Sequence, residues 1–256
     1  MKKLATILAV IIIIMIAATS VSAADLSVVL PAVNAGEADA LDNFSFDNPL
    51  IGWIIPDVLR IEFDLRVTGN INPYGSIFCF HNNDAYGRVA LTMGGGLFFN
   101  NWSGYWFDAG LHNSVYDNIL SQYADETIHV KMTFDYDTFA VYLNDELAYD
   151  ANTLKTNLDS AGAFYGEGLT DEYLSVITYI CMRETLDFGY NSWWISNSET
   201  VSDTTNADIA DFSIYCDDKL VATYFAGGEV GNNVIHVESE YESPETDAPE
   251  TKAPET

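Results

Sequence analysis

The sequence predicts an all-β fold, a β-sandwich of two antiparallel sheets, and two strictly alternating stretches carry most of this prediction. In Leu59–Val67 and in Ile128–Tyr136, apolar residues alternate with polar or charged ones. A two-residue period is typical of a strand with one face on a core and the other in water. We therefore expect the following side chains to share one core: Leu59, Ile61, Phe63, Leu65, Val130, Met132, Phe134, Val141 and Leu143.

Turn residues divide the rest of the chain into short strands. Gly94–Gly96 breaks the chain, and Asn144-Asp145 and Asp217-Asp218 are each placed to make a tight hairpin. Ser76–Phe80 and Leu174–Met182 are apolar on both faces, which favours central strands, the second of them within an expected strand at Leu174–Arg183. Tyr116–Tyr123 is the only stretch that indicates a short helix. Further strands are expected at Ser27–Leu30, Ser76–Phe80, Arg88–Met93, Leu97–Phe99, Tyr105–Phe107, Phe139–Leu143, Glu146–Tyr149, Ile209–Tyr215 and Leu220–Phe225.

The chain divides into three segments. Residues 1–23 have a basic start, a short apolar run and small residues before the expected cleavage point at Ala23, as a secretory signal peptide does. Residues 24–237 have the composition of one globular domain. Residues 238–256 repeat Pro-Glu-Thr and cannot bury a core, which predicts a disordered acidic linker. We expect a secreted or extracellular protein, cell-wall associated if a further module or wall anchor follows the linker, with no membrane insertion after signal cleavage.

Charge and cysteine content narrow the function classes. With 38 acidic residues against 10 Lys and Arg, the net charge is −28, which excludes nucleic acid as a partner because phosphate binding needs clustered basic residues. Cys79, Cys181 and Cys216 lie in apolar runs and are best interpreted as small buried hydrophobes, although a Cys181–Cys216 bridge stays open. The four histidines are scattered singly and match no metal-ligand spacing.

Thr127–Tyr149 resembles the core hairpin of laminin-G-like, concanavalin A-like jelly-roll domains. Val58–Val67 leading into Gly75–Phe80 resembles the opening strand pair, and Ala207–Tyr215 followed by Lys219–Phe225 resembles the closing strands. The resemblance spans most of the domain and implies a concanavalin A-like jelly roll. It also implies that a carbohydrate ligand, and a calcium ion held by loop oxygens, are compatible with the fold.

The same resemblance argues against catalysis. Laminarinase-type glucanases on this fold carry Glu-x-Asp-x-x-Glu on one strand, and the nearest match here is Glu62-Phe63-Asp64 with Val67 at the position of the second Glu. Without that acid no group protonates the leaving group of a retaining reaction. We therefore expect no glycoside hydrolysis, and we interpret Arg60, Glu62, Asp64 and Arg66 as a charged outer strand face whose members pair with neighbours.

Two aromatic clusters remain as candidate binding residues. Trp102, Tyr105 and Trp106 form one cluster, and Tyr190, Trp193 and Trp194 form the other. Flanking Asn, Ser and Gly favour loops or edges, where flat rings stack on sugars; the alternative is that two of the tryptophans fill the core. For calcium the best local candidates are Asn82, Asn83 and Asp84, although the pattern favours an ordinary Asx turn over a calcium site.

The resulting hypothesis is a secreted, non-catalytic carbohydrate-binding or adhesive module at a bacterial surface. It requires no cofactor, although Ca²⁺ stays open, and its partner is a polysaccharide or glycan. A structural or protein-binding domain of the same fold is the first alternative, and a glycoside hydrolase on this scaffold is the second.

Overall fold

The computed structural model describes residues 28–31, 33–34, 42–51, 55–68, 75–82, 88–100, 106–109, 119–152, 175–191 and 206–236. The expected signal peptide and acidic linker lie outside these residues. No helix within the described part is long and apolar enough to cross a membrane.

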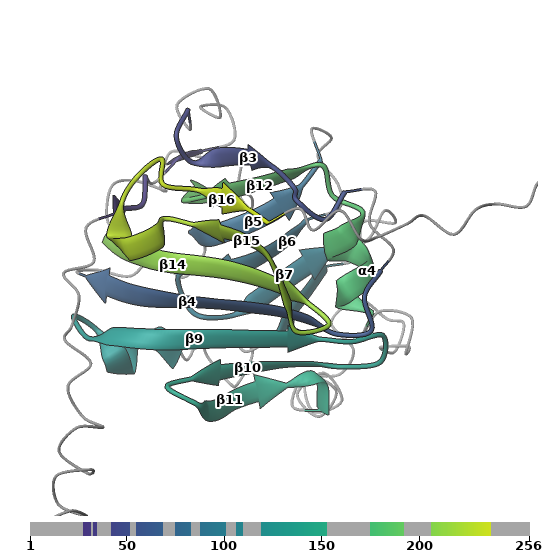
Figure 1. Ribbon diagram of the computed structural model, residues 1–256. Helices are drawn as coiled ribbons and strands as arrows, with labels where there is room; N and C mark the ends of the chain where they lie inside the picture. The colour runs from purple at the N-terminus through teal and green to yellow at the C-terminus, as the bar shows by residue number, and fades with distance from the viewer. Residues whose placement is uncertain are drawn as a thin grey trace, which may run out of the picture.

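The larger of two stacked sheets has eight strands and faces the viewer in Figure 1. Its order is β11-β10-β9-β4-β14-β15-β16, and β1 also pairs with β14, always antiparallel. The strand bounds are β1 Val28–Val29, β4 Leu59–Thr68, β9 Thr127–Phe134, β10 Phe139–Leu143, β11 Glu146–Asp150, β14 Asn206–Cys216, β15 Lys219–Tyr224 and β16 Val234–Ile235.

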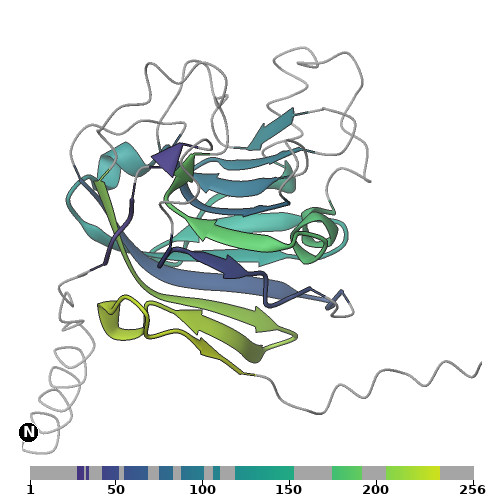
Figure 2. The same cartoon turned by 90° about the horizontal axis from the view of Figure 1, so that it is seen from above.

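The second sheet has six antiparallel strands in the order β3-β12-β5-β6-β7-β8. Figure 2 shows its blue and green strands as a layer apart from the yellow-green strands β14 to β16. The bounds are β3 Ser45–Asp47, β5 Ser76–His81, β6 Val89–Thr92, β7 Leu97–Asn100, β8 Trp106–Ala109 and β12 Thr185–Phe188. The smaller elements are the parallel pair β2 Val33–Asn34 and β13 Tyr190–Asn191, the helix α4 Val176–Cys181, and the 3₁₀ turns η2 Ile119–Tyr123 and η4 Ala226–Gly228.

The core between the sheets is built from the apolar side chains that the alternation predicts. All nine expected core residues are at most 3% exposed, and the alternate residues of β4 and β9 are only half-buried. Phe212 of β14 lies at the centre, with its ring centroid 5.2 Å from those of Phe63 and Phe78 and 4.8 Å from that of Phe188. Edge-to-face and tilted contacts of this kind join the two sheets. The predicted fold class is confirmed.

Both predicted hairpins are tight turns at positive φ. Asn144 and Asp145 have φ of 51° and 64°, and Asp217 and Asp218 have φ of 48° and 65°. Two consecutive left-handed residues match the right-handed twist of the flanking strands, and Asn and Asp tolerate this conformation better than other side chains. The first turn fixes the register of β10 with β11, and the second fixes that of β14 with β15.

Two expectations about strands were wrong, and one strand was missed. The run 174–183 contains helix α4 instead of a central strand; its buried residues are Val176, Ile177, Ile180 and Cys181, a helical spacing that a short, uniformly apolar run conceals. The expected opening pair is not a pair, because β4 belongs to the eight-stranded sheet and β5 to the six-stranded one. Strand β12, which pairs with β5, was not expected at all.

Candidate functional site

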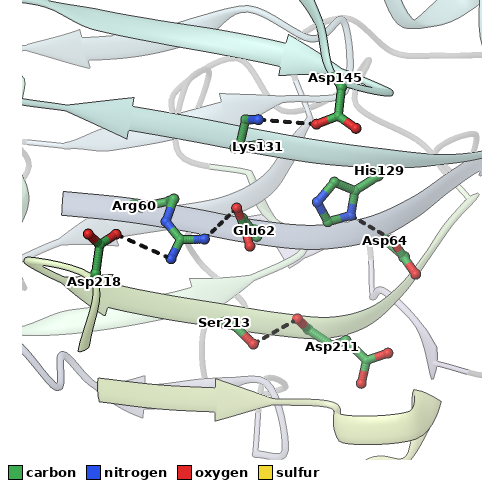
Figure 3. A network of polar contacts seen from close by, with 9 residues as sticks. All are labelled: Arg60, Glu62, Asp64, His129, Lys131, Asp145, Asp211, Ser213 and Asp218. Atoms are coloured by element: carbon green, nitrogen blue, oxygen red, sulfur yellow. Dashed lines mark hydrogen bonds and ion pairs between the residues drawn. The ribbon is translucent and has the colours of Figure 1, made fainter. Parts of the chain in front are cut away.

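The outward face of the eight-stranded sheet carries mutually paired charges (Figure 3). Arg60 Nη1 lies 2.6 Å from Glu62 Oε1, and His129 Nδ1 lies 2.9 Å from Asp64 Oδ1. Lys131 Nζ lies 3.1 Å from Asp145 Oδ1. Arg66 pairs with Asp208 on the neighbouring strand. The interpretation of this strand face as a set of paired charges is confirmed.

The cations of this face also cover its aromatic rings. The guanidinium carbon of Arg60 lies 4.0 Å from the ring centroid of Tyr215, and Lys131 Nζ lies 4.8 Å from that of Tyr142. A ring that is stacked under a cation offers less of its surface to a sugar. This face therefore has few aromatic or charged groups left for a ligand.

His129 is the titrating residue of this face. Its hydrogen bond to Asp64 raises its pKa, partial burial opposes the rise, and the nearby charges of Asp64, Glu62 and Asp145 add to it. Since the imidazole is 43% exposed, the pair is a surface interaction worth less than about 1 kcal/mol.

The residues that resemble a glucanase motif lie on two different faces of β4. Glu62 and Asp64 point outward, whereas Val67 is buried with the core. Glu62 and Asp64 are engaged by Arg60 and His129, as described above. The absence of glycoside hydrolysis stays a prediction.

The outward face of the six-stranded sheet has a different character, because it carries buried polar side chains. Phe78 and Phe80 of β5 point toward the core, so the alternating Cys79 and His81 lie on the opposite, outward face. In β12, Phe188 contacts core rings, which places Asp187 on the outward face as well. His81 is 7% exposed and Asp187 is 2% exposed.

His81 and Asp187 form a close pair across β5 and β12. His81 Nε2 lies 2.5 Å from Asp187 Oδ2, and His81 Nδ1 lies 3.0 Å from the carbonyl oxygen of Asn82. Both ring nitrogens thus face oxygens that accept hydrogen bonds, an arrangement that is satisfied when both carry hydrogen.

Buried charges gather at one end of this sheet. The buried acidic and basic side chains among the described residues are His81, Arg88, Arg183, Asp187 and Asp208. The first four come from the end at which β5 finishes and β6 and β12 begin, because Thr185 is paired with His81 and Val89 with Phe80. Asp208 alone belongs to the other sheet, where it pairs with Arg66. Four of the five buried charged side chains of the described residues thus come from one end of one sheet, which makes this end the candidate site.

The first aromatic cluster begins at this same end of the sheet. Val89 is paired with Phe99 and Asn100 with Trp106, so β8 starts, at Trp106, at the end that holds His81 and Arg88. Tyr190 follows β12 and therefore leaves the sheet at the opposite end. Trp102, Tyr105, Trp193 and Trp194 lie outside the described residues, and of Trp106 and Tyr190 only the backbone is described.

Of the calcium candidates, only Asn82 is described. Its side-chain oxygen accepts a hydrogen bond from the Glu184 backbone N–H at 2.9 Å, which ties the end of β5 to the start of β12. Asn83 and Asp84 lie outside the described residues. No group of three or more His, Cys, Asp or Glu that could hold a metal was found among the described residues. A calcium site stays a prediction.

The sequence could have revealed His81 and Asp187 only in part. In the sequence His81 is a single histidine without a neighbouring ligand residue, and its partner is 106 positions away. The alternation Leu186-Asp187-Phe188 is a short strand signal that the preceding apolar run obscured. Nothing local to either residue indicates that they meet.

No family model and no curated protein sequence matches the chain. Among solved structures it is similar to domain 4 of an extracellular arabinanase from Geobacillus stearothermophilus, in complex with arabinotriose. That match has 13% identity and a TM-score of 0.37, and covers 64% of this chain and 63% of that one. A match to botulinum neurotoxin type C has 16% identity and a TM-score of 0.39, and covers 64% of this chain and 33% of that one. A match to a carbohydrate-binding module from Bacillus subtilis has 13% identity and a TM-score of 0.32, and covers 62% of this chain and 74% of that one. The chain thus matches less than two thirds of the arabinanase domain and of the neurotoxin chain, and scores this low establish neither family nor ligand.

Proposed function

We propose that this chain is a secreted, non-catalytic carbohydrate-binding module with a laminin-G-like, concanavalin A-like sandwich. The glycan binds at the end of the six-stranded sheet where β5 finishes and β8 begins. The observation that supports this location is the concentration of buried His81, Arg88, Arg183 and Asp187 at that end.

The two outward faces differ in what they offer a ligand. On the eight-stranded sheet the charges pair with one another and cations cover two tyrosine rings. At one end of the six-stranded sheet, buried polar side chains come from β5, from β12 and from the residues that precede β6 and β12, and β8 starts at this same end with β6 and β7 between it and β5. Sugar sites combine a few placed polar groups with aromatic rings that stack on the apolar faces of the sugar. The second combination fits a glycan better than the first.

The test is retention of polysaccharides by the domain and by two matched variants. We expect binding to at least one of β-glucan, xylan or mannan in affinity gels. Trp106→Ala should weaken that binding several-fold, since a lost ring contact costs on the order of 1 kcal/mol. Trp193→Ala, a change two positions after β13 in the sequence, should leave binding unchanged. Retention should also persist at high salt, because rings rather than exposed charges carry it.

Thermal unfolding of both variants separates a binding defect from a folding defect. If the domain retains none of the polysaccharides, or if Trp106→Ala unfolds it, the tryptophan belongs to the core and a structural or protein-binding role takes the place of glycan binding. Release of reducing sugar from a bound polysaccharide would contradict the non-catalytic part of the proposal.

A further inference from the structure

Asp187 uses only one of its two carboxylate oxygens within the described part of the protein. Oδ2 accepts from His81 Nε2 at 2.5 Å, while Oδ1 is buried and has no hydrogen-bond donor among the described residues. Its neighbours across the sheet are Cys79 on β5 and Ser45 on β3. The oxygen therefore lies on the outward face, at the strand pair that ends in His81.

A buried carboxylate oxygen without a donor is costly. Taking a polar group out of water without replacing its hydrogen bond destabilises the folded protein, and the effect is larger for a charged group. His81 cannot serve both oxygens, because its other ring nitrogen faces the Asn82 carbonyl. The pair thus leaves one acceptor oxygen of Asp187 without a donor among the described residues.

We infer that Asp187 Oδ1 accepts a hydrogen bond from a hydroxyl group of the bound sugar, with His81 as the positioning residue that fixes the carboxylate. This inference rests on the proposed function and adds to it the polar contact that the aromatic rings do not supply. A sugar hydroxyl fits because it is a neutral donor. A carboxylate or sulfate oxygen on the ligand could only accept, and would be repelled by Asp187.

His81 sets the direction of the contact. The 2.5 Å bond holds Oδ2, so rotation of the carboxylate is restricted and Oδ1 keeps one orientation. A hydrogen bond to an ionised acceptor is stronger than one between neutral groups, and this gives one hydroxyl position of the sugar a large share of the selectivity.

The experiment compares Asp187→Asn with a matched control, Asp208→Asn. Both remove the charge of a buried aspartate without changing its shape, but Asp208 pairs with Arg66 on the other sheet. Affinity for oligosaccharides of β-glucan, xylan and mannan is measured by calorimetry, and folding by thermal unfolding. We expect Asp187→Asn to weaken binding about tenfold or more, and Asp208→Asn to leave the dissociation constant unchanged.

A ligand series with the unmodified protein covers the case in which Asp187→Asn does not fold. Methylation of a single sugar hydroxyl removes its donor and keeps its acceptor, so at one ring position it should weaken binding about as much as Asp187→Asn does. His81→Gln retains a donor for Asp187 and should keep more affinity than His81→Leu.

The outcomes separate the two proposals. Suppose that Trp106→Ala weakens binding, that Asp187→Asn binds as tightly as the parent protein, and that every methylated sugar binds as tightly as the unmethylated one. The location of the site is then right and the hydroxyl contact is wrong. Equal losses in Asp187→Asn and Asp208→Asn overturn the contact too. If the parent protein binds no oligosaccharide, both proposals fall.

Discussion

Asn48 holds the segment that leads into β12, and its replacement by Ala should destabilise the domain markedly. Its side-chain amide donates to the carbonyl oxygens of Ile180 at 2.9 Å and Arg183 at 2.8 Å, and its side-chain oxygen accepts from the Leu50 N–H at 3.0 Å. Asn48 is 1% exposed, so water cannot replace these bonds. The side chain thereby gives a second donor to the Ile180 carbonyl, which also accepts from the Arg183 N–H at 3.2 Å, and a donor to the Arg183 carbonyl at the exit of helix α4.

The magnitude follows from the three bonds. At about 1 kcal/mol of net stability each, Asn48→Ala should lower the free energy of unfolding by about 3 kcal/mol. For a domain of about 200 residues, 1 kcal/mol corresponds to roughly 2–4 °C, so the melting temperature should fall by about 6–12 °C. The assay is thermal unfolding followed by circular dichroism.

The matched control is Asn232→Ala, which removes an exposed amide that donates to the Ala226 carbonyl at 3.3 Å. Exposed substitutions of this kind cost within about 0.5 kcal/mol, hence less than about 2 °C. A melting temperature of Asn48→Ala no lower than that of Asn232→Ala would refute the reasoning, because buried amide bonds would then contribute no more than exposed ones.

Two further predictions concern titrating groups. Because Asp64 raises the pKa of His129 above its ordinary value of about 6.5, the stability from this pair is fully present below that value and is lost as the pH rises through the higher folded-state pKa. The stability difference between the parent and Asp64→Asn should accordingly shrink in denaturant titrations from pH 6 toward pH 9, and a difference that grows would contradict the assignment. Burial raises the pKa of Cys181 and Cys216 to about 12, with Cys181 and Asp217 adding to the effect at Cys216. Both thiols should therefore resist iodoacetamide at pH 8 until denaturant is added, whereas rapid alkylation of the folded protein would show them to be exposed.

The cysteines illustrate what the sequence could predict. Cys79, Cys181 and Cys216 are buried free thiols, as their apolar surroundings indicated, and no bridge joins Cys181 to Cys216 in this structure. Alternation in β4 and β9 and the two Asx turns likewise predict faces and hairpins, since both signals are local. Interactions between residues close in the sequence determine these faces and turns.

Sheet membership and the candidate site depend on contacts far apart in the chain. Nothing in the composition of β4 or β5 indicates that consecutive strands belong to different sheets. The four-residue strand β12 follows a short helix whose apolar sequence also suits a strand, so its register with β5 could not be predicted. The pairing of His81 with Asp187 depends on that register and was missed with it.

The two outward faces show why burial, more than the presence of charge, identifies the candidate site. Arg60 with Glu62 and His129 with Asp64 are half-exposed pairs, and such pairs contribute little because water screens them and already solvates each partner. His81 and Asp187 have lost that water, so their mutual attraction must offset a desolvation penalty of several kcal/mol per ion. An apolar pair in the same place would avoid the penalty, as it does elsewhere on β5 and β12, where Phe78 is paired with Phe188. Fold stability alone thus gives no reason for charges at this position, whereas the proposed contact with a sugar hydroxyl would use such a fixed, desolvated acceptor.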